Sequence, residues 1–289
     1  MFNKRHIVRT IAATVSILAL SFTAACGSGQ STASNSTDSD DITQQTYKPG
    51  KLTIATGQPA YEPWVMNDKP ESGEGYEAAV AYAVADKLGF KKSDVVWTRT
   101  AFDTAIAPGA KDWDFNIQQF GITDERKKAV DFSSSYYNDS QSVVVKKDSK
   151  FANATKVSDL KDATVGVMVG TLAYDYAKAN IKDDIQTFND DAALAQALDA
   201  GQIDALVTST VECVYMVQSE QVKDAKVLGR LPDSEDKSGM GIVLPKDSKL
   251  TAAVTKAVDD LNADGTIKKL QDKWLAEYTT DLTELKKSK

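Results

Sequence analysis

The sequence predicts an α/β protein of two lobes, each a mostly parallel sheet covered by helices, with a hinge and a cleft between them. Three observations predict this fold. The chain has 289 residues, about twice the usual size of one domain. Apolar strands alternate with amphipathic helices along the chain, which is typical of parallel sheets. One strand-and-helix unit and one apolar strand each occur twice, once in each half of the chain.

The composition excludes several classes of function. Hydrophobic residues make up 42% of the chain and charged residues 26%, which is the balance of a globular protein. The net charge of −7 argues against a nucleic-acid partner, because proteins that bind polyanions are basic. His6 is the only histidine and lies in the leader predicted below, so the mature protein would have none, which excludes histidine-dependent nucleophiles and metal sites. We expect no metal and no cofactor, and the leading interpretation given below is a protein without enzymatic activity. Cys26 and Cys213 are the only cysteines, so no disulfide framework is available.

The first residues have the pattern of a secreted lipoprotein. Residues 1–25 have a basic start, an apolar middle and small residues at the end, as in a signal peptide. Ala24-Ala25-Cys26 resembles a bacterial lipobox, whose cysteine carries a lipid such as palmitate, although Thr23 stands where that motif usually has Leu. The alternative is an uncut membrane anchor. Residues 26–47 then form the lipidated cysteine and a polar, flexible tether. We expect a protein anchored to the outer face of the bacterial cell membrane.

The first elements of the body follow hydrophobic periodicity. Residues 51–56 predict a short buried strand closed by Gly57 and Pro59. Apolar residues at helical spacing then predict a helix over residues 76–88, which ends at Gly89.

A helix-and-strand unit follows once in each half. Residues 102–106 predict a helix that breaks at Pro108-Gly109 and leads into a strand over residues 114–117. Residues 189–191 predict the cap of a second such helix, which Gly201 ends before a strand over residues 204–207.

Two matched strands predict the hinge. Residues 143–149 and 242–248 share an apolar strand followed by Lys-Asp-Ser, and we interpret them as paired crossings between the lobes. The first lobe would take residues 48–143 and 243–289, and the second would take residues 144–242. Two C-terminal helices, over residues 250–261 and 265–278, would pack on the first lobe.

Arg126 is the main candidate for ligand chemistry. Residues 120–126 predict a strand end and a helix start, with Thr123 as N-cap and Asp124 and Glu125 in the first turn. Arg126 opposes the dipole of that helix at a cost of about 0.3 kcal/mol. A ligand carboxylate held in two parallel hydrogen bonds would offset this cost. A solvated arginine paired with a nearby acid is the alternative.

A second carboxylate site is predicted in the other lobe. Residues 165–171 predict a strand that runs into a turn, and a helix follows over residues 172–179. Free backbone N–H groups at a helix N-terminus bind anions, and Gly170 allows close approach. Thr171 could also be a simple helix cap. Tyr61, Trp64 and Phe102 follow strand ends in the first lobe and suit the apolar wall of a small cation or zwitterion, although core packing is the alternative.

Over residues 48–278 these motifs resemble the polar amino-acid binding proteins of bacterial ABC importers, solute-binding family 3. The glutamine-binding and histidine-binding members are the most similar. The resemblance is carried by Gly-Ile-Thr-Asp-Glu-Arg at 121–126 and its continuation to Ser133, Tyr136-Tyr137, and the segments 144–149, 159–161, 165–171, 175–182 and 201–205.

The resemblance implies a type II periplasmic-binding-protein-like fold that closes around one amino acid through a two-strand hinge. Arg126 matches the arginine that binds the ligand α-carboxylate. Thr171 and the amide after it, that of Leu172, would bind the same group from the second lobe. The other ligand-binding positions are Gln58, Tyr61, Phe102, Gln119, Gly121, Met168 and Ser209.

This chain departs from the family pattern where the ligand ammonium binds. Ser209 stands where the family has an aspartate, and Gln58 stands where an Asp is common. Gly121 replaces a Ser or Thr. Our hypothesis is that Glu212 substitutes for the missing aspartate, with Glu62 and Glu77 as alternatives. Otherwise the ligand is not an ordinary free α-amino acid.

We therefore expect a monomeric lipoprotein that captures a polar amino acid, or a related small carboxylate-bearing metabolite, for an ABC permease and its ATPase. Two other classes stay open. One is an enzyme similar to the cyclohexadienyl dehydratases, which use a carboxylate as general acid. The other is a surface lipoprotein that senses or adheres.

Overall fold

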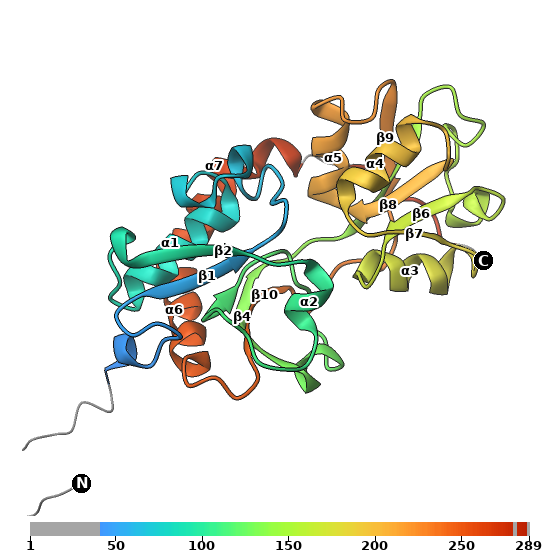
Figure 1. The fold of residues 1–289 in the computed structure, drawn as a ribbon. Helices are drawn as coiled ribbons and strands as arrows, with labels where there is room; N and C mark the ends of the chain where they lie inside the picture. Colours follow the sequence, from blue (N-terminus) through green and yellow to red (C-terminus); the bar gives the residue numbers. More distant parts are fainter. Residues whose placement is uncertain (1–40, 280–281, 288–289) are drawn as a thin grey trace, which may run out of the picture. The chain divides into compact units, whose positions relative to one another are not determined.

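The computed structural model of the protein describes residues 41–279 and 282–287. The predicted signal peptide and Cys26 lie outside these residues. The described chain forms two five-stranded sheets, each with its own helices and its own core (Figure 1). The prediction of a two-lobe α/β fold is confirmed.

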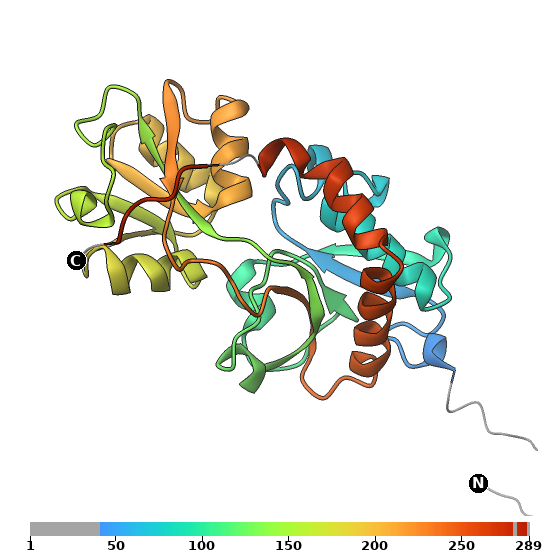
Figure 2. The ribbon, with the colours of Figure 1, turned by 180° about the vertical axis from the view of Figure 1, so that it is seen from behind.

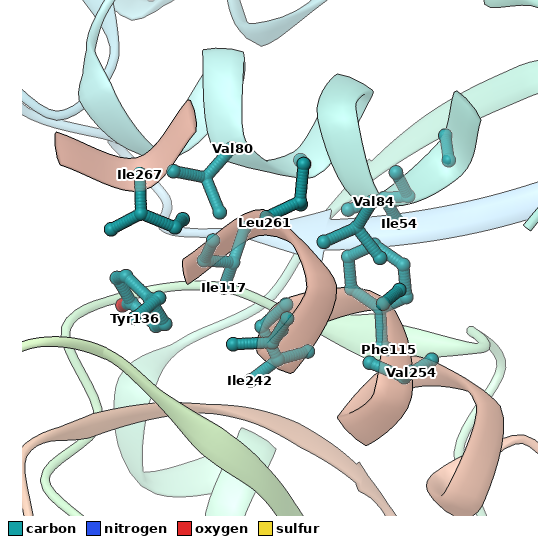
Figure 3. Packing of buried hydrophobic residues seen from close by; sticks show 14 of the residues in the cluster. Ile54, Val80, Val84, Phe115, Ile117, Tyr136, Ile242, Val254, Leu261 and Ile267 are labelled. Carbon is teal, nitrogen blue, oxygen red and sulfur yellow. The ribbon is translucent and has the colours of Figure 1, made fainter. Parts of the chain in front are cut away.

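The first lobe is built on a sheet in which β10 alone runs antiparallel to its neighbours. Its strand order is β2 (Val95–Arg99), β1 (Leu52–Thr56), β3 (Phe115–Asn116), β10 (Met240–Pro245) and β4 (Val130–Tyr137). Ile54 and Ile242 point to one face, which α1 (Tyr76–Lys87), α6 (Thr251–Ala263) and α7 (Thr266–Trp274) cover (Figure 3). Ala55 and Val243 point to the opposite face, because successive side chains alternate along a strand, and α2 (Phe102–Ile106) packs there.

The second lobe repeats this plan, with β5 as its one antiparallel strand. Its strand order is β7 (Gln186–Phe188), β6 (Val165–Met168), β8 (Ala205–Ser209), β5 (Gln141–Lys146) and β9 (Ala225–Arg230). One face packs against α3 (Leu172–Asn180), and the other packs against α4 (Asp191–Asp199) and α5 (Thr210–Gln218). Single-turn helices are η1 (Ile42–Gln44), η2 (Met66–Asp68), η3 (Pro70–Ser72), η4 (Lys92–Asp94), η5 (Arg126–Lys128), η6 (Val157–Leu160) and η7 (Ala276–Tyr278).

The hinge differs from the prediction. The two strands that carry the Lys-Asp-Ser motif are β5 and β10, and they occupy the same place in their two sheets. Val143, which we assigned to the first lobe, pairs with Val207 in the second sheet, and Ile242 belongs to the core of the first. The residues of β5 and β10 are paired with neighbours of a single sheet, so they do not form the crossings. The crossings are the segments just before these strands, residues 138–140 and 231–239.

The C-terminal segment also differs from the prediction, which placed residues 243–289 in the first lobe. Residues 282–287 lie along β9 of the second lobe (Figure 2). Arg230 N donates to Thr283 O at 3.0 Å, and Leu285 N donates to Arg230 O at 2.9 Å. Leu285 is 3% exposed and belongs to the second-lobe core. A Cβ on Gly229 would lie 2.4 Å from Thr283 O, so only glycine allows this approach. We call residues 282–287 the C-terminal strap.

Candidate functional site

A cavity lies where the carboxyl ends of the parallel strands of both lobes meet, as is usual for ligand sites in open α/β sheets. It encloses about 830 Å³ of space, part of it open to solvent. The first lobe contributes the loops after β1 and β3, and the second contributes the loops after β6 and β8. Nine of the ten predicted site residues line the cavity: Tyr61, Phe102, Gln119, Gly121, Arg126, Met168, Thr171, Leu172 and Ser209.

Gln58 is the exception. Its side chain is exposed and lines a neighbouring opening with Tyr61, Phe102 and Met168. The turn that follows β1 carries it out of the cavity.

The Arg126 side chain spans the two lobes. Its Nη1 donates to Gly121 O at 2.6 Å in the first lobe, and its Nη2 donates to Gly170 O at 2.8 Å in the second. Its guanidinium carbon lies 5.5 Å from the centre of the Phe102 ring, within cation–π range. Burial lowers the pKa of Arg126, while the carboxylates of Asp175 and Asp236 raise it. A guanidinium has five N–H donors, so three remain for a ligand.

The local structure around Arg126 corrects one argument from the sequence. Thr123 Oγ1 accepts from Arg126 N at 3.1 Å, although the N-cap position of the helical turn that follows is Glu125 rather than Thr123. The helix that follows, however, is the single 3₁₀ turn η5. One turn has too few aligned peptides for a macrodipole of the assumed size, so dipole opposition does not explain Arg126.

The start of α3 faces the cavity from the second lobe. Thr171 caps this helix through its Oγ1, which accepts from Tyr174 N at 3.2 Å and donates to Met168 O at 2.8 Å. Gly170 has a φ of +74°, which favours glycine. Residues 171–173 line the cavity, so the first free N–H groups of α3 are available to a carboxylate.

Ser209 serves α5 as its N-cap. Its Oγ accepts from Glu212 N at 3.2 Å, so part of the hydroxyl's hydrogen-bonding capacity is already used. A serine in this role cannot supply a negative charge.

Of the three acids considered as substitutes, only Glu212 lines the cavity. It is 4% exposed, and its Oε1 accepts from Trp64 Nε1 of the first lobe at 2.6 Å. Burial raises the pKa of Glu212 well above its ordinary value, and the nearby carboxylate of Asp191 adds to this shift. Glu62 instead accepts from Tyr215 OH at 3.1 Å.

Glu77 has a structural role beneath the cavity. Its Oε1 accepts from Gln119 N at 2.7 Å, and its carboxylate also accepts from Gln119 Nε2 and Tyr136 OH. Burial raises the pKa of Glu77 to about 7, and these donors oppose the shift. Glu77 therefore fixes Gln119, whose φ is +52°, at the cavity wall.

Three acidic residues that line the cavity were missed from the sequence. Asp139 lies in the first crossing, Asp236 in the second, and Asp191 is the first residue of α4. Burial raises the pKa of Asp139 and of Asp191 to about 6. In the sequence Asp191 has the pattern of a helix cap, which is the role of its neighbour Asp190, and Asp139 has the pattern of a turn. Only the fold brings them together.

Three further features of the described residues concern metal ligands, membrane-spanning helices and the free cysteine. None of the acid, histidine and cysteine side chains in residues 41–279 and 282–287 forms a group of three suited to a metal ion. No helix within the same residues has the length and apolar character to cross a membrane. Cys213 is buried with a free thiol, 3.7 Å from Thr208 O.

Known proteins share this architecture. An L-arginine-binding protein of Pseudomonas aeruginosa is 29% identical over 245 residues, covering 79% of this chain and 88% of that protein. The L-cystine-binding protein TcyJ of Escherichia coli is 30% identical over 223 residues, covering 76% and 81%. An ancestral arginine-binding protein bound to arginine has a TM-score of 0.67 and 31% identity, covering 78% of this chain and 98% of that one. These neighbours are amino-acid-binding proteins.

The family model of the bacterial extracellular solute-binding proteins, family 3, matches residues 52–277. This range contains both sheets and all the residues that line the cavity. The chain therefore belongs to the bacterial extracellular solute-binding proteins, family 3.

Proposed function

We propose that this chain is the substrate-binding lipoprotein of an ABC importer, and that it captures a polar amino acid in the cavity and delivers it to the permease. The observation that carries the proposal is the position of Arg126. Its guanidinium bonds to backbone oxygens of both lobes and has donors to spare. A ligand α-carboxylate bound there, and by the start of α3, would join the two lobes.

The remaining predicted residues complete the site in this proposal. Tyr61 and Phe102 form an aromatic wall, and Phe102 is itself held by stacking on Phe120 at 4.5 Å between ring centres. Gln119, Gly121 and Met168 shape the space beside the ligand. Catalysis is not part of the proposal, and the names of the relatives, which describe binding, support this.

Thermal unfolding of the chain without residues 1–26, in the presence of single amino acids, tests the proposal. Binding to the native state at a hundredfold excess over Kd adds about 2.7 kcal/mol of stability, which in a chain of this size raises Tm by about 5–11 °C. Arg126→Ala should abolish the rise, because hydrogen bonds to charged groups contribute about 1.5–3 kcal/mol each. Arg126→Lys keeps the positive charge but cannot form the two parallel hydrogen bonds that a guanidinium makes to a carboxylate.

Two controls make the result interpretable. Arg230→Ala removes an exposed arginine outside the cavity, and it should leave the ligand-dependent rise unchanged. Prephenate and arogenate should neither be turned over nor raise Tm, whereas turnover would favour the dehydratase alternative. An equal rise in the wild-type and Arg126→Ala proteins would contradict the proposed carboxylate site.

The anchor requires its own test, because Cys26 lies outside the described residues. We expect the full chain expressed in a bacterial host to fractionate with membranes and to incorporate labelled palmitate. Cys26→Ser should prevent both. Membrane attachment that survives this substitution would favour the uncut-anchor alternative.

A further inference from the structure

The charges that line the cavity are unequal and are separated. Arg126 is the one basic residue among the lining residues of the described chain, whereas four acids line it: Asp139, Asp191, Glu212 and Asp236. The electrostatic interactions divide these acids into two groups. Asp236 acts on Arg126, while Asp139 and Asp191 act on Glu212. We call Asp139, Asp191 and Glu212 the anionic end of the cavity.

Asp139 gives this end an unused acceptor. The residue is 7% exposed. Its Oδ1 accepts from Ser140 N at 2.7 Å. Its Oδ2 is buried and has no hydrogen bond of good geometry in the described residues, although Ser209 and the backbone N–H groups of Thr210 and Val211, at the start of α5, stabilise the carboxylate. These donors are neutral, so a positively charged donor inside the cavity would satisfy Oδ2 better, and no side chain of the lining supplies a positive charge at this end.

The other members of the anionic end also keep free acceptor capacity. Asp191 accepts a long bond from Thr208 Oγ1 at 3.4 Å. Glu212 accepts from Trp64 Nε1 through Oε1. Burial raises the pKa of the Tyr61 hydroxyl, and the carboxylates of Asp190, Asp191 and Glu212 add to the shift, so an aromatic residue that also lines the cavity borders this end. Carboxylates beside an aromatic ring are a suitable environment for an organic cation.

From this geometry we propose that the ligand is an amino acid with a positively charged side chain, and that Asp139 and Asp191 are the residues that select it. The proposal rests on the proposed function, in which Arg126 binds the α-carboxylate. One positive charge, the α-ammonium, can compensate only one of the two aspartates Asp139 and Asp191, whereas a second positive charge on the side chain can compensate the other. An acidic side chain would be rejected by the same carboxylates.

Calorimetric titration of the chain without residues 1–26 tests this inference. L-arginine, L-lysine and L-ornithine are the cationic probes. L-citrulline is the matched neutral probe, because it has the length of arginine with a ureido group in place of the guanidinium. We expect the best cationic probe to bind about 10- to 100-fold more tightly than citrulline, as the loss of one charged hydrogen bond implies.

Substitutions of single aspartates test which carboxylates determine the preference for a cationic side chain. Asp191→Asn should reduce the ratio of cationic to citrulline affinity by about tenfold or more. Asp190→Asn is the matched control, because Asp190 is the adjacent acid, caps α4 through Ala193 N, and does not line the main cavity. It should leave the ratio within about twofold. Asp139→Asn should act as Asp191→Asn does, and a Tm of the free protein near the wild-type value shows that the hinge is intact.

The possible outcomes separate the two proposals. If citrulline binds as tightly as the best cationic probe, or if both Asp191→Asn and Asp139→Asn keep the wild-type ratio, the inference is wrong. If a neutral amino acid binds in an Arg126-dependent way and no cationic one does, the proposed function stands and the inference fails. If no amino acid binds at all, the proposed function itself fails.

Discussion

Gly121 provides a direct test of how the two lobes meet. A Cβ at this position would lie 2.5 Å from Leu172 Cδ1 and 2.8 Å from Asp236 Oδ2. Leu172 belongs to the second lobe and Asp236 to the hinge, so the clash of Gly121→Ala would fall between the lobes. Gly121 has no positive φ, so the backbone itself tolerates alanine. We expect the free protein to keep its stability and the bound form to lose it.

The size of the effect follows from the contacts. Separations below 3 Å force a shift, and overpacking of this kind costs about 1–3 kcal/mol. If the whole of this free energy opposes closure of the lobes around the ligand, the ligand Kd rises by about 5- to 150-fold. Leu172→Ala removes Leu172 Cδ1 and Cγ, and with Cδ1 the nearest atom that alanine would meet, while Asp236 Oδ2 stays. The double variant should therefore bind more tightly than Gly121→Ala alone, with a coupling of opposite sign to the single effects.

A second glycine supplies the matched control. A Cβ on Gly241 would meet Ile122 at 2.8 Å and Phe132 at 3.1 Å, and both of these residues are in the first lobe. Gly241→Ala should lower the Tm of the free protein, with a smaller effect on Kd than Gly121→Ala. Calorimetric titration and thermal unfolding of all four variants measure both quantities. The reasoning is refuted if Gly121→Ala binds within twofold of wild type, or if Leu172→Ala gives no rescue.

Two further predictions concern the strap and the acids of the cavity. Leu285→Ala should lower the free energy of unfolding, measured by urea denaturation, by about 2–5 kcal/mol, because it truncates a buried leucine in the second-lobe core. Lys287→Ala, at an exposed position of the C-terminal strap, is the control and should lower it by less than about 0.5 kcal/mol. Equal effects would show that the strap is not anchored through Leu285. Burial raises the pKa of Asp139 in the native state to about 6, so between pH 4 and 6 the native state holds a proton that the unfolded chain releases. This proton contributes on the order of 2 kcal/mol to the free energy of unfolding at pH 4, and the contribution is lost as pH rises through 6. Asp139→Asn should flatten the fall of ligand-free stability between pH 4 and 7, where Asp191, whose pKa burial also raises to about 6, titrates as well; an unchanged slope would contradict the assignment.

The sequence predicts most elements because their burial depends on local pattern. The helix expected over residues 76–88 is α1, and the short helix expected over residues 102–106 is α2. The C-terminal helices expected over residues 250–261 and 265–278 are α6 and α7 with η7. In each case one apolar face at helical spacing meets a sheet, and tertiary packing does not override it.

Features that depend on distant contacts could not be predicted in this way. The strap carries few apolar residues, and nothing local shows that Leu285 enters the second-lobe core. The sequence shows that residue 77 is a glutamate, but it does not show where the side chain lies. In the structure the Glu77 carboxylate accepts a hydrogen bond from Gln119 N. Asp139 and Asp191 are 52 positions apart in the numbering and reach the same cavity only through the pairing of β5 with β8 and the docking of α4.

The strap also sets a length limit on the movement of the lobes. Tyr278 packs against the first-lobe core, and Thr283 is hydrogen-bonded to β9 of the second. Five peptide steps separate them, and a fully extended chain spans at most about 18 Å over that distance. Together with the two hinge crossings, this segment is a third connection between the lobes. Its chain length limits how far the lobes can separate at this edge unless Leu285 leaves the second-lobe core.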